Sequence, residues 1–249
     1  MTPAFLAYYI SFSDKCKGLY FLGIYDMMKA KTEVFPMADF KQMYYEKRAQ
    51  VLVKNLKSRH FDAYYCADKD SALEKALELI PKGASVGWGG SVTAQQIGLL
   101  DAVRSSDYNA IDRDKYEDPA DKAKAMKQSL TADVFLTGAN AISLDGQMVN
   151  VDGNANRVAA ICYGPDSVIV IAGMNKVEDT LEAAITRART VAAPMNKQRF
   201  LNGTTPCEVT GACADCRSEG CICNQIVITR GSRPAGRIKF IIVGEELGF

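Results

Sequence analysis

The chain has 249 residues, 48% hydrophobic and 24% charged, which is the composition of a globular protein with one large α/β domain or two small ones. Its net charge of +1 provides no global field to recruit nucleic acid or an anionic membrane, although local groups can still bind a small anion. The single histidine, His60, excludes histidine-rich metal sites and histidine-based catalytic triads unless His60 itself takes part.

The N-terminal segment differs in character from the rest of the chain. Its two apolar runs, 4–12 and 19–25, are separated by charged residues, and neither reaches the ~18 residues of a membrane span. No basic residue precedes the first run, which argues against a signal peptide. We therefore interpret residues 1–36 as an N-terminal extension outside the fold, with weak membrane association as the alternative. Residues 37–249 are expected to form a single domain, located in the cytoplasm.

From residue 37 onward, helical and strand patterns alternate. The spacing of apolar residues predicts helices over 38–59, 70–80, 92–103, 119–130, 154–163 and 178–192. Strands are predicted over 61–67, 84–88, 107–112, 133–137, 167–173, 225–230 and 237–244. The pair Asp145-Gly146 predicts a hairpin over 141–150.

This alternation predicts a three-layer α/β fold with a mixed, mainly parallel sheet. Several strands are continuous apolar runs, which is typical of parallel strands covered by helices on both faces. The last two strands, 225–230 and 237–244, are close in sequence. We expect them to pair as a hairpin, and this antiparallel pair would make the sheet mixed.

Three of the predicted strands end in glycine-rich or polar segments. Gly89-Gly90-Ser91 follows strand 84–88, Gly138-Ala139-Asn140 follows strand 133–137, and Gly173-Met174-Asn175-Lys176 follows strand 167–173. In open α/β sheets, ligands bind beyond the carboxyl ends of the strands. If these strands are neighbours, their loops converge on one crevice, with residues 150–157 folded over it. The sequence thus predicts a pocket for a small anionic metabolite.

The glycine loop has a functional and a structural interpretation. Gly89 and Gly90 let backbone amides approach an anion before a helix begins, and Ser91 or Thr93 can donate a hydroxyl. This is not a Walker loop, because no Gly-Lys-Ser/Thr follows. The alternative is that the glycines only permit tight packing between the strand and the helix.

The segment 137–159 contains four Asn, two Asp, three Gly and one Arg, more polar chemistry than a hairpin needs. Arg157 is a candidate to grip a carboxylate or phosphate, with a surface salt bridge as the alternative. Asp152 and Lys176 are the candidate catalytic residues. Asp152 would be the acid or base, or else a helix cap; Lys176 would be a point charge or a nucleophile if buried. The candidates to orient ligand hydroxyls are Asn140, Asn150 and Asn154.

Five of the eight cysteines fall within residues 207–223, which points to a reducing compartment and a metal rather than disulfides. They are Cys207, Cys213, Cys216, Cys221 and Cys223. Four thiolates suit tetrahedral zinc or an iron–sulfur cluster. The alternative is a surface loop with reduced, unliganded thiols.

Several segments between Tyr44 and Phe249 together resemble the LUD-domain family, the lactate-utilisation proteins. They are GWGGSVT (87–93), ADVFLTGANAISLDGQMVNVDGNANRVAA (132–160), VIVIAGMNK (168–176), AAPMN (192–196), TPCEVTGACADC (205–216) and VGEELGF (243–249). The resemblance implies the fold shared by glucosamine-6-phosphate deaminase, ribose-5-phosphate isomerase and CoA-transferases. It also implies a link to the oxidation of L-lactate to pyruvate, where some members act beside iron–sulfur partner proteins.

The resemblance assigns no catalytic residue, but it selects among the cysteines. In the family pattern a single cysteine precedes the next strand, which matches Cys223 and leaves out Cys221. The metal ligands implied are then Cys207, Cys213 and Cys216 with Cys223.

Three functions stay open at this point. The first is a catalytic or accessory component in oxidation of L-lactate or a related hydroxy acid. The second is an isomerase- or CoA-transferase-like enzyme on a phosphorylated or CoA-linked substrate. The third is a non-catalytic ligand-binding domain in which a structural zinc ion holds the cysteine segment together. A homo-oligomer is among the alternatives for the assembly.

Overall fold

The structure is a computed structural model, and it describes residues 37–249, of which residues 41–249 form one compact unit. The interpretation of residues 1–36 as an extension lies outside the described residues. Within 37–249, no helix combines the length and apolar character needed to cross a lipid bilayer.

A six-stranded sheet forms the centre of this unit, and each of its neighbouring strand pairs is parallel. In their order across the sheet, the strands are β1 (Asp62–Cys66), β10 (Ile238–Val243), β7 (Ser167–Gly173), β4 (Val134–Gly138), β2 (Ser85–Trp88) and β3 (Asn109–Ile111). The predicted α/β class with a mainly parallel sheet is confirmed.

A second, four-stranded sheet carries the antiparallel pairings found in residues 37–249. Its strands, in order, are β8 (Val177–Glu178), β5 (Ala141–Ser143), β6 (Met148–Asp152) and β9 (Gln225–Thr229). The hairpin predicted at Asp145-Gly146 joins β5 to β6, and Gly146 has a φ of 90°, which glycine adopts readily. The polar segment 137–159 therefore starts at the end of β4 in the large sheet and continues through β5 and β6 in the small one.

The predicted hairpin between the last two strands is wrong. β9 pairs antiparallel with β6 in the small sheet, whereas β10 lies between β1 and β7 in the large one. The burial of the two strands explains the difference. β10 is buried along almost its whole length, as a central parallel strand should be, while exposed and half-buried residues alternate along β9, an edge strand.

The six predicted helices are present in order, but one is interrupted, the one predicted from residue 178 begins at Leu181, and α10 in the cysteine segment was not predicted. The helices are α2 (Met37–Ser58), α3 (Lys69–Glu78), α4 (Val92–Gln96), α5 (Leu99–Ser105), α6 (Pro119–Gln128), α7 (Asn156–Cys162), α8 (Leu181–Arg187), α9 (Ala193–Lys197) and α10 (Pro206–Thr210). The helix predicted over 92–103 is divided into α4 and α5 at Gly98, whose φ of 76° is incompatible with a continuous helix.

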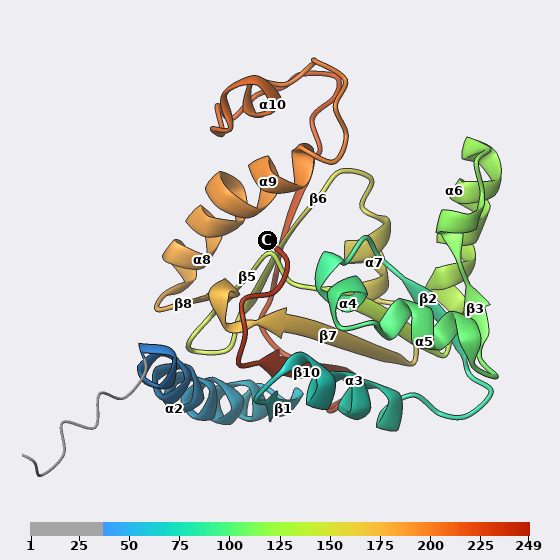
Figure 1. The fold of residues 1–249 in the computed structure, drawn as a ribbon. Coiled ribbons are helices and arrows are strands. Elements are labelled where there is room, and N and C mark those ends of the chain that lie inside the picture. Colours follow the sequence, from blue (N-terminus) through green and yellow to red (C-terminus); the bar gives the residue numbers. More distant parts are fainter. Residues whose placement is uncertain (1–36) are drawn as a thin grey trace, which may run out of the picture. The chain divides into compact units, whose positions relative to one another are not determined.

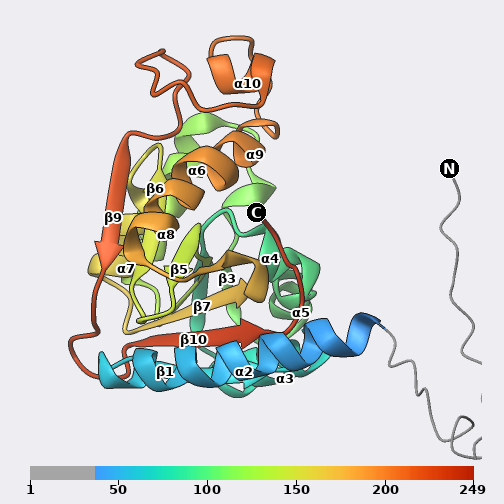
Figure 2. The same cartoon turned by 90° about the vertical axis from the view of Figure 1, so that its left-hand side faces the viewer.

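Side chains that alternate along the central strands build two cores, one on each face of the large sheet. Val134 and Leu136 of β4 face a core formed with α3, α4 and α5. Phe135, between them, faces the opposite core, formed with α2, α7 and the small sheet. Figures 1 and 2 show these layers.

A third core lies on the other face of the small sheet. Ala141 and Val149 pack there against Ala184 of α8 and Ala193 of α9. The chain then continues from α9 to α10, and both views place α10 at the end of the unit opposite β1 (Figures 1 and 2). The cysteine segment is therefore attached beside α9, close to the carboxyl ends of the central strands.

Candidate functional site

Three adjacent strands of the large sheet, β7, β4 and β2, run in parallel and end at one edge. The loops that follow them meet around a pocket of about 310 Å³. Gly90 and Ser91 come from the β2 loop, Asn140 from the β4 loop, and Lys176 from the turn after β7. A pocket of this size suits a small-molecule ligand.

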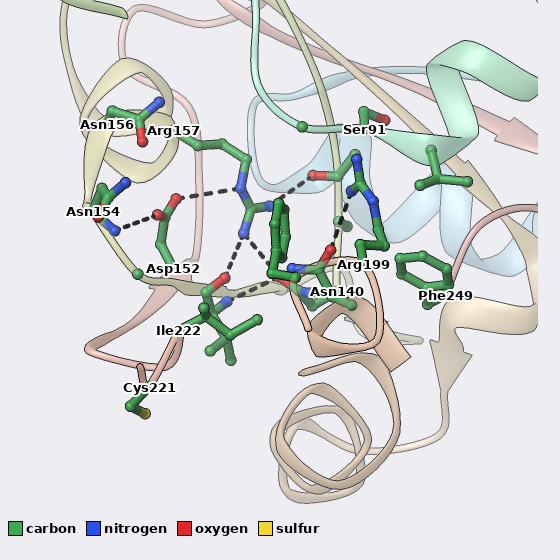
Figure 3. A pocket seen from close by; sticks show the side chains of 18 of the residues that line it. Ser91, Asn140, Asp152, Asn154, Asn156, Arg157, Arg199, Cys221, Ile222 and Phe249 are labelled. Atoms are coloured by element: carbon green, nitrogen blue, oxygen red, sulfur yellow. Dashed lines mark hydrogen bonds and ion pairs between the residues drawn. The ribbon is translucent and has the colours of Figure 1, made fainter. Parts of the chain in front are cut away.

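Most of the residues singled out in the sequence line this pocket, and the others lie directly behind its wall. The residues that line it are Gly90, Ser91, Asn140, Asp152, Asn154, Arg157 and Lys176. Gly89, Thr93 and Asn150 are not in the lining, but each contacts a residue that is. Figure 3 shows the site, with Arg157 at the centre of a network of hydrogen bonds.

Arg157, in the first turn of α7, directs its guanidinium at protein oxygen atoms. Nη1 donates to Asn150 Oδ1 at 2.6 Å and to the Gly138 carbonyl at 3.3 Å. Nη2 donates to Asn140 Oδ1 at 3.0 Å and to the Val151 carbonyl at 2.6 Å. Since Nε also faces Asp152, the five N–H groups of this side chain are directed at protein acceptors. This arrangement makes Arg157 a part of the pocket wall that joins β4, β6 and α7.

The two oxygen atoms of Asp152 have different surroundings. Oδ1 accepts from the backbone amides of Asn154 and Ala155, both at 3.2 Å, and so holds the turn that leads into α7. Oδ2 lies 3.3 Å from Arg157 Nε, is buried, and accepts no hydrogen bond from any described residue. Asp152 thus has the structural role considered for it, at the turn before α7, and also forms an ion pair with Arg157.

The glycine loop fits closely around two arginines. A Cβ atom at Gly89 would lie 2.9 Å from Cγ and Cδ of Arg157, so any side chain there would displace the guanidinium. A Cβ atom at Gly90 would lie 3.0 Å from Arg113 Nη2. The Ser91 hydroxyl accepts from the Ala94 amide at 3.2 Å as the cap of α4. The packing interpretation therefore applies to Gly89, while Gly90 and Ser91 also form pocket surface.

Lys176 is a buried amine with an unusual set of neighbours. Its side chain is 4% exposed, and Nζ donates to Thr93 Oγ1 at 2.9 Å. Among the described residues no carboxylate forms an ion pair with it. Burial lowers the pKa of Lys176 from 10.5 to about 7, and the positive charges of Arg187 and Arg157 contribute to the shift. A substantial fraction of this amine is therefore neutral at neutral pH.

Arg187, in the last turn of α8, fixes two of the strand ends relative to each other. It donates to the Asn140 carbonyl at 2.6 Å and to the Asn175 carbonyl at 3.0 Å. These bonds connect the loop after β4 with the turn after β7. The sequence does not indicate this role, because the apolar periodicity that predicts a helix over 178–192 says nothing about the partners of its polar side chains.

Two further arginines at the pocket were not identified from the sequence. Arg113 follows the short strand β3, and Arg199 follows α9. Arg199 donates to Asn196 at 3.2 Å, and Arg113 lies 3.5 Å from Asp114, with its Nε making no hydrogen bond to a described residue. The lining side chains of the pocket thus include three guanidinium groups and the partly neutral amine of Lys176, with Asp152 as the side-chain carboxylate. The excess of positive charge favours an anionic ligand.

The segment after β10 closes one side of the site. Gly248 donates its amide to Gln96 Oε1 at 2.6 Å, and the Leu247 amide donates to Asn175 Oδ1 at 3.1 Å. A Cβ atom at Gly248 would lie 2.5 Å from Thr93 Oγ1 and 2.9 Å from Lys176 Nζ. Phe249, which lines the pocket, lies between α4 and α9 in both ribbon views.

All five cysteines of the segment 207–223 line a second, smaller cavity of about 70 Å³. Cys221 and Ile222 line both this cavity and the larger pocket, so they form the wall between the two. Burial and the neighbouring thiols raise the pKa of Cys223 to about 12. Within the part of the chain that the structure describes, no three His, Cys, Asp or Glu side chains are grouped closely enough to hold a metal ion.

Comparison with known families identifies the chain. The model of the LUD domain matches residues 49–243, which cover the pocket from Gly90 to Ile222. The chain belongs to the LUD-domain family. At the level of the family it is therefore a lactate-utilisation-type protein.

The remaining comparisons are weaker. No curated protein matches the chain. Among solved structures, it is similar to a DUF162 family protein from Deinococcus radiodurans, with 12% identity and a TM-score of 0.45 over 81% of this chain and 97% of that one. It is also similar to eIF2B delta from Chaetomium thermophilum, with 16% identity and a TM-score of 0.31 over 55% of this chain and 54% of that one.

Proposed function

We propose that this LUD-domain protein binds a small hydroxy acid or oxo acid, such as L-lactate or pyruvate, and serves its oxidation as a catalytic or accessory component. The observation that carries the proposal is the pocket's charge: Arg113, Arg157, Lys176 and Arg199 line it with one side-chain carboxylate. The volume of about 310 Å³ is at the lower end of the range for ligand pockets, which favours a small molecule.

The available hydrogen-bond donors suggest how such a ligand is held. Arg157 is engaged by protein oxygen atoms, whereas Arg113 and Arg199 retain N–H groups for the ligand carboxylate. Asn140 accepts through Oδ1 from the Val151 amide and from Arg157, which leaves its amide nitrogen for the hydroxyl or oxo group of the ligand. The carboxylate and the reacting group would then be recognised by separate elements.

Oxidation of a 2-hydroxy acid to a 2-oxo acid releases two electrons and two protons. Asp152 Oδ2 lies 3.3 Å from Arg157 Nε and accepts no hydrogen bond from the residues that the structure describes, and on this basis we assign Asp152 as the base that takes the hydroxyl proton. Lys176 in its neutral form is a second acceptor. The electrons need an acceptor, and we assign this part to an iron–sulfur partner protein, in line with the family.

For the cysteine cavity we propose a thiolate metal centre, either an iron–sulfur cluster or zinc. The chemistry of the side chains supports the proposal, because five thiols line one cavity and Cys207, Cys213, Cys216 and Cys223 are among them. The arrangement of the side chains is not itself a coordination sphere, so no step of the reaction is assigned to the metal.

Elemental analysis and an absorption spectrum of anaerobically purified protein test the metal. A cluster gives iron, sulfide and visible absorption, while zinc gives a colourless protein with stoichiometric metal. Cys213→Ser should lower the metal content, and Cys162→Ser, which changes an exposed cysteine outside the segment, should leave it unchanged. Metal-free protein from anaerobic cells would overturn this assignment.

A thermal-shift panel tests the ligand class. L-lactate, pyruvate and related acids should raise the unfolding temperature, and Arg199→Gln should reduce the shift. Arg230→Gln is the control, because Arg230 is exposed and outside the pocket lining. If sugar phosphates or CoA esters stabilise the protein and the small acids do not, the isomerase- or CoA-transferase-like alternative replaces this proposal. A response to no ligand at all would contradict both and favour a non-catalytic domain.

A further inference from the structure

We propose that the amine of Lys176 condenses with the carbonyl group of a small 2-oxo acid to form an imine in the pocket. The inference rests on the proposed function, since it places the oxo acid in that same site, and it names the covalent chemistry that the site would perform.

Two buried lysines, Lys197 and Lys176, have different surroundings. Lys197 is 1% exposed, and its Nζ is held by Glu208 at 3.3 Å, the Phe200 carbonyl at 2.8 Å and Asn202 Oδ1 at 2.7 Å. Lys176 is 4% exposed, and its one hydrogen-bond partner among the described residues is the neutral Thr93 hydroxyl. Lys197 is thus a satisfied structural cation, whereas Lys176 is a buried amine that lines a pocket and has no counter-ion among residues 37–249.

The surroundings of Lys176 keep the amine in a reactive state. Burial and the nearby Arg187 and Arg157 lower the pKa of Lys176 to about 7, so that the neutral, nucleophilic form is present at neutral pH. A base whose pKa lies near 7 is well matched to proton transfer near neutral pH.

The backbone at two glycines packs close to the amine. A Cβ atom at Gly138 would lie 3.9 Å from Lys176 Nζ, and one at Gly248 would lie 2.9 Å from it. The Ser91 hydroxyl lies on the same side of Gly138, at 3.0 Å from that Cβ position. This close packing leaves no room for a ligand beside Gly248. Lys176 and Ser91 both line the pocket, so a carbonyl carbon approaches the amine from the pocket, where a hydroxyl donor is also present.

The reaction balances without an external oxidant or reductant. The nitrogen lone pair of Lys176 forms a bond to the carbonyl carbon, and the carbon–oxygen π pair moves to oxygen, which takes up a proton. One proton moves from the nitrogen to this oxygen as the carbinolamine forms. The carbinolamine then breaks down: its carbon–oxygen bond breaks, the nitrogen gives up its second proton, and the hydroxyl group leaves with a proton as water. The products are one C=N bond and one water molecule. Thr93 Oγ1, 2.9 Å from Nζ, is placed to pass a proton from the amine.

Borohydride trapping of the full-length protein tests the imine. Pyruvate and sodium borohydride should leave a stable reduced adduct on the peptide that contains Lys176, and the peptide that contains Lys197 serves as an internal control. L-lactate, which has no carbonyl group to condense, should give no adduct. The adduct should be absent from Lys176→Met, whose folding is checked by thermal unfolding. The labelled fraction at a fixed time should increase as the pH is raised from 6 to about 8.

A calorimetric titration with pyruvate, made without borohydride, separates the two proposals. Pyruvate that binds but leaves no adduct on Lys176, or adducts spread evenly over exposed lysines, would overturn the imine and leave the proposed function standing. Pyruvate that neither binds nor labels would overturn both.

Discussion

At the scale of single residues, the pocket depends on Arg157. Arg157→Lys removes donors from the Asn150 and Asn140 side chains and from two backbone carbonyls, all in a largely buried environment. Because buried acceptors left without donors are costly, we expect a loss of about 2–4 kcal/mol in the free energy of unfolding. Chemical denaturation measures it.

Arg48→Lys is the matched control for this substitution. Arg48 forms an ion pair at 2.6 Å with Asp179, whose side chain is 75% exposed, so the loss should be below about 1 kcal/mol. Equal losses in the two variants would contradict the central role given to Arg157.

Because the pKa of Lys176 is lowered in the folded state, the free energy of unfolding should depend on pH. The unfolded chain holds the proton of this amine up to about pH 10.5, whereas the folded chain releases it at about 7. The unfolded state therefore binds more protons between these values, and the wild type gains stability as the pH rises through this window, by about 1.4 kcal/mol per pH unit from this group. Below pH 7 the cost of burying the charge is present in full.

Lys176→Met removes this dependence. The stability of the variant relative to the wild type should be greatest below pH 7 and should decline from there toward pH 9, as measured by denaturant unfolding at several pH values. A difference that stays constant with pH would show that the amine is not buried as described.

At the scale of elements, α7 begins under strain. Ala155, the residue before the helix, has a φ of 64°, a left-handed conformation that disfavours side chains with a Cβ atom. Ala155→Gly should relieve this and stabilise the protein by about 0.5–1 kcal/mol, after allowance for the greater freedom of glycine in the unfolded chain. Ala159→Gly, at an exposed position within α7, should instead destabilise by about 1 kcal/mol. Thermal unfolding measures both changes. If the two variants shift the unfolding temperature in the same direction, this account of Ala155 is contradicted.

The order of the helices and strands could be predicted from the sequence, but their pairing could not be predicted throughout. Apolar periodicity identifies β10 as a strand, and its near-continuous burial fits a central parallel position. Proximity along the chain suggested a hairpin with β9, yet β9 has the alternating pattern of an edge strand. Pairing depends on which sheet can bury each face, and this is decided by contacts distant in sequence.

At the scale of the whole molecule, the position of the pocket follows from the parallel sheet. The ends of β2, β4 and β7 share one edge, and so the glycine loop, Asn140 and Lys176 could be placed together from the sequence. Arg113 and Arg199 could not be placed, because the first follows a short strand and the second follows α9, which has no strand end of its own. The engagement of Arg157 by protein oxygen atoms could not be predicted either, since it depends on how segments 138–140 and 150–152 are placed around the side chain.

The charge of the pocket is a property of the assembled domain, and its test is a direct titration. Calorimetry should detect binding of pyruvate or L-lactate to the wild type. The double variant Arg113→Gln/Arg199→Gln should bind at least about tenfold more weakly, because it loses the two cations that retain free N–H groups. Arg230→Gln should bind as the wild type does. Unchanged affinity in the double variant, or no binding of either acid to the wild type, would contradict the assignment of this pocket to a small hydroxy or oxo acid.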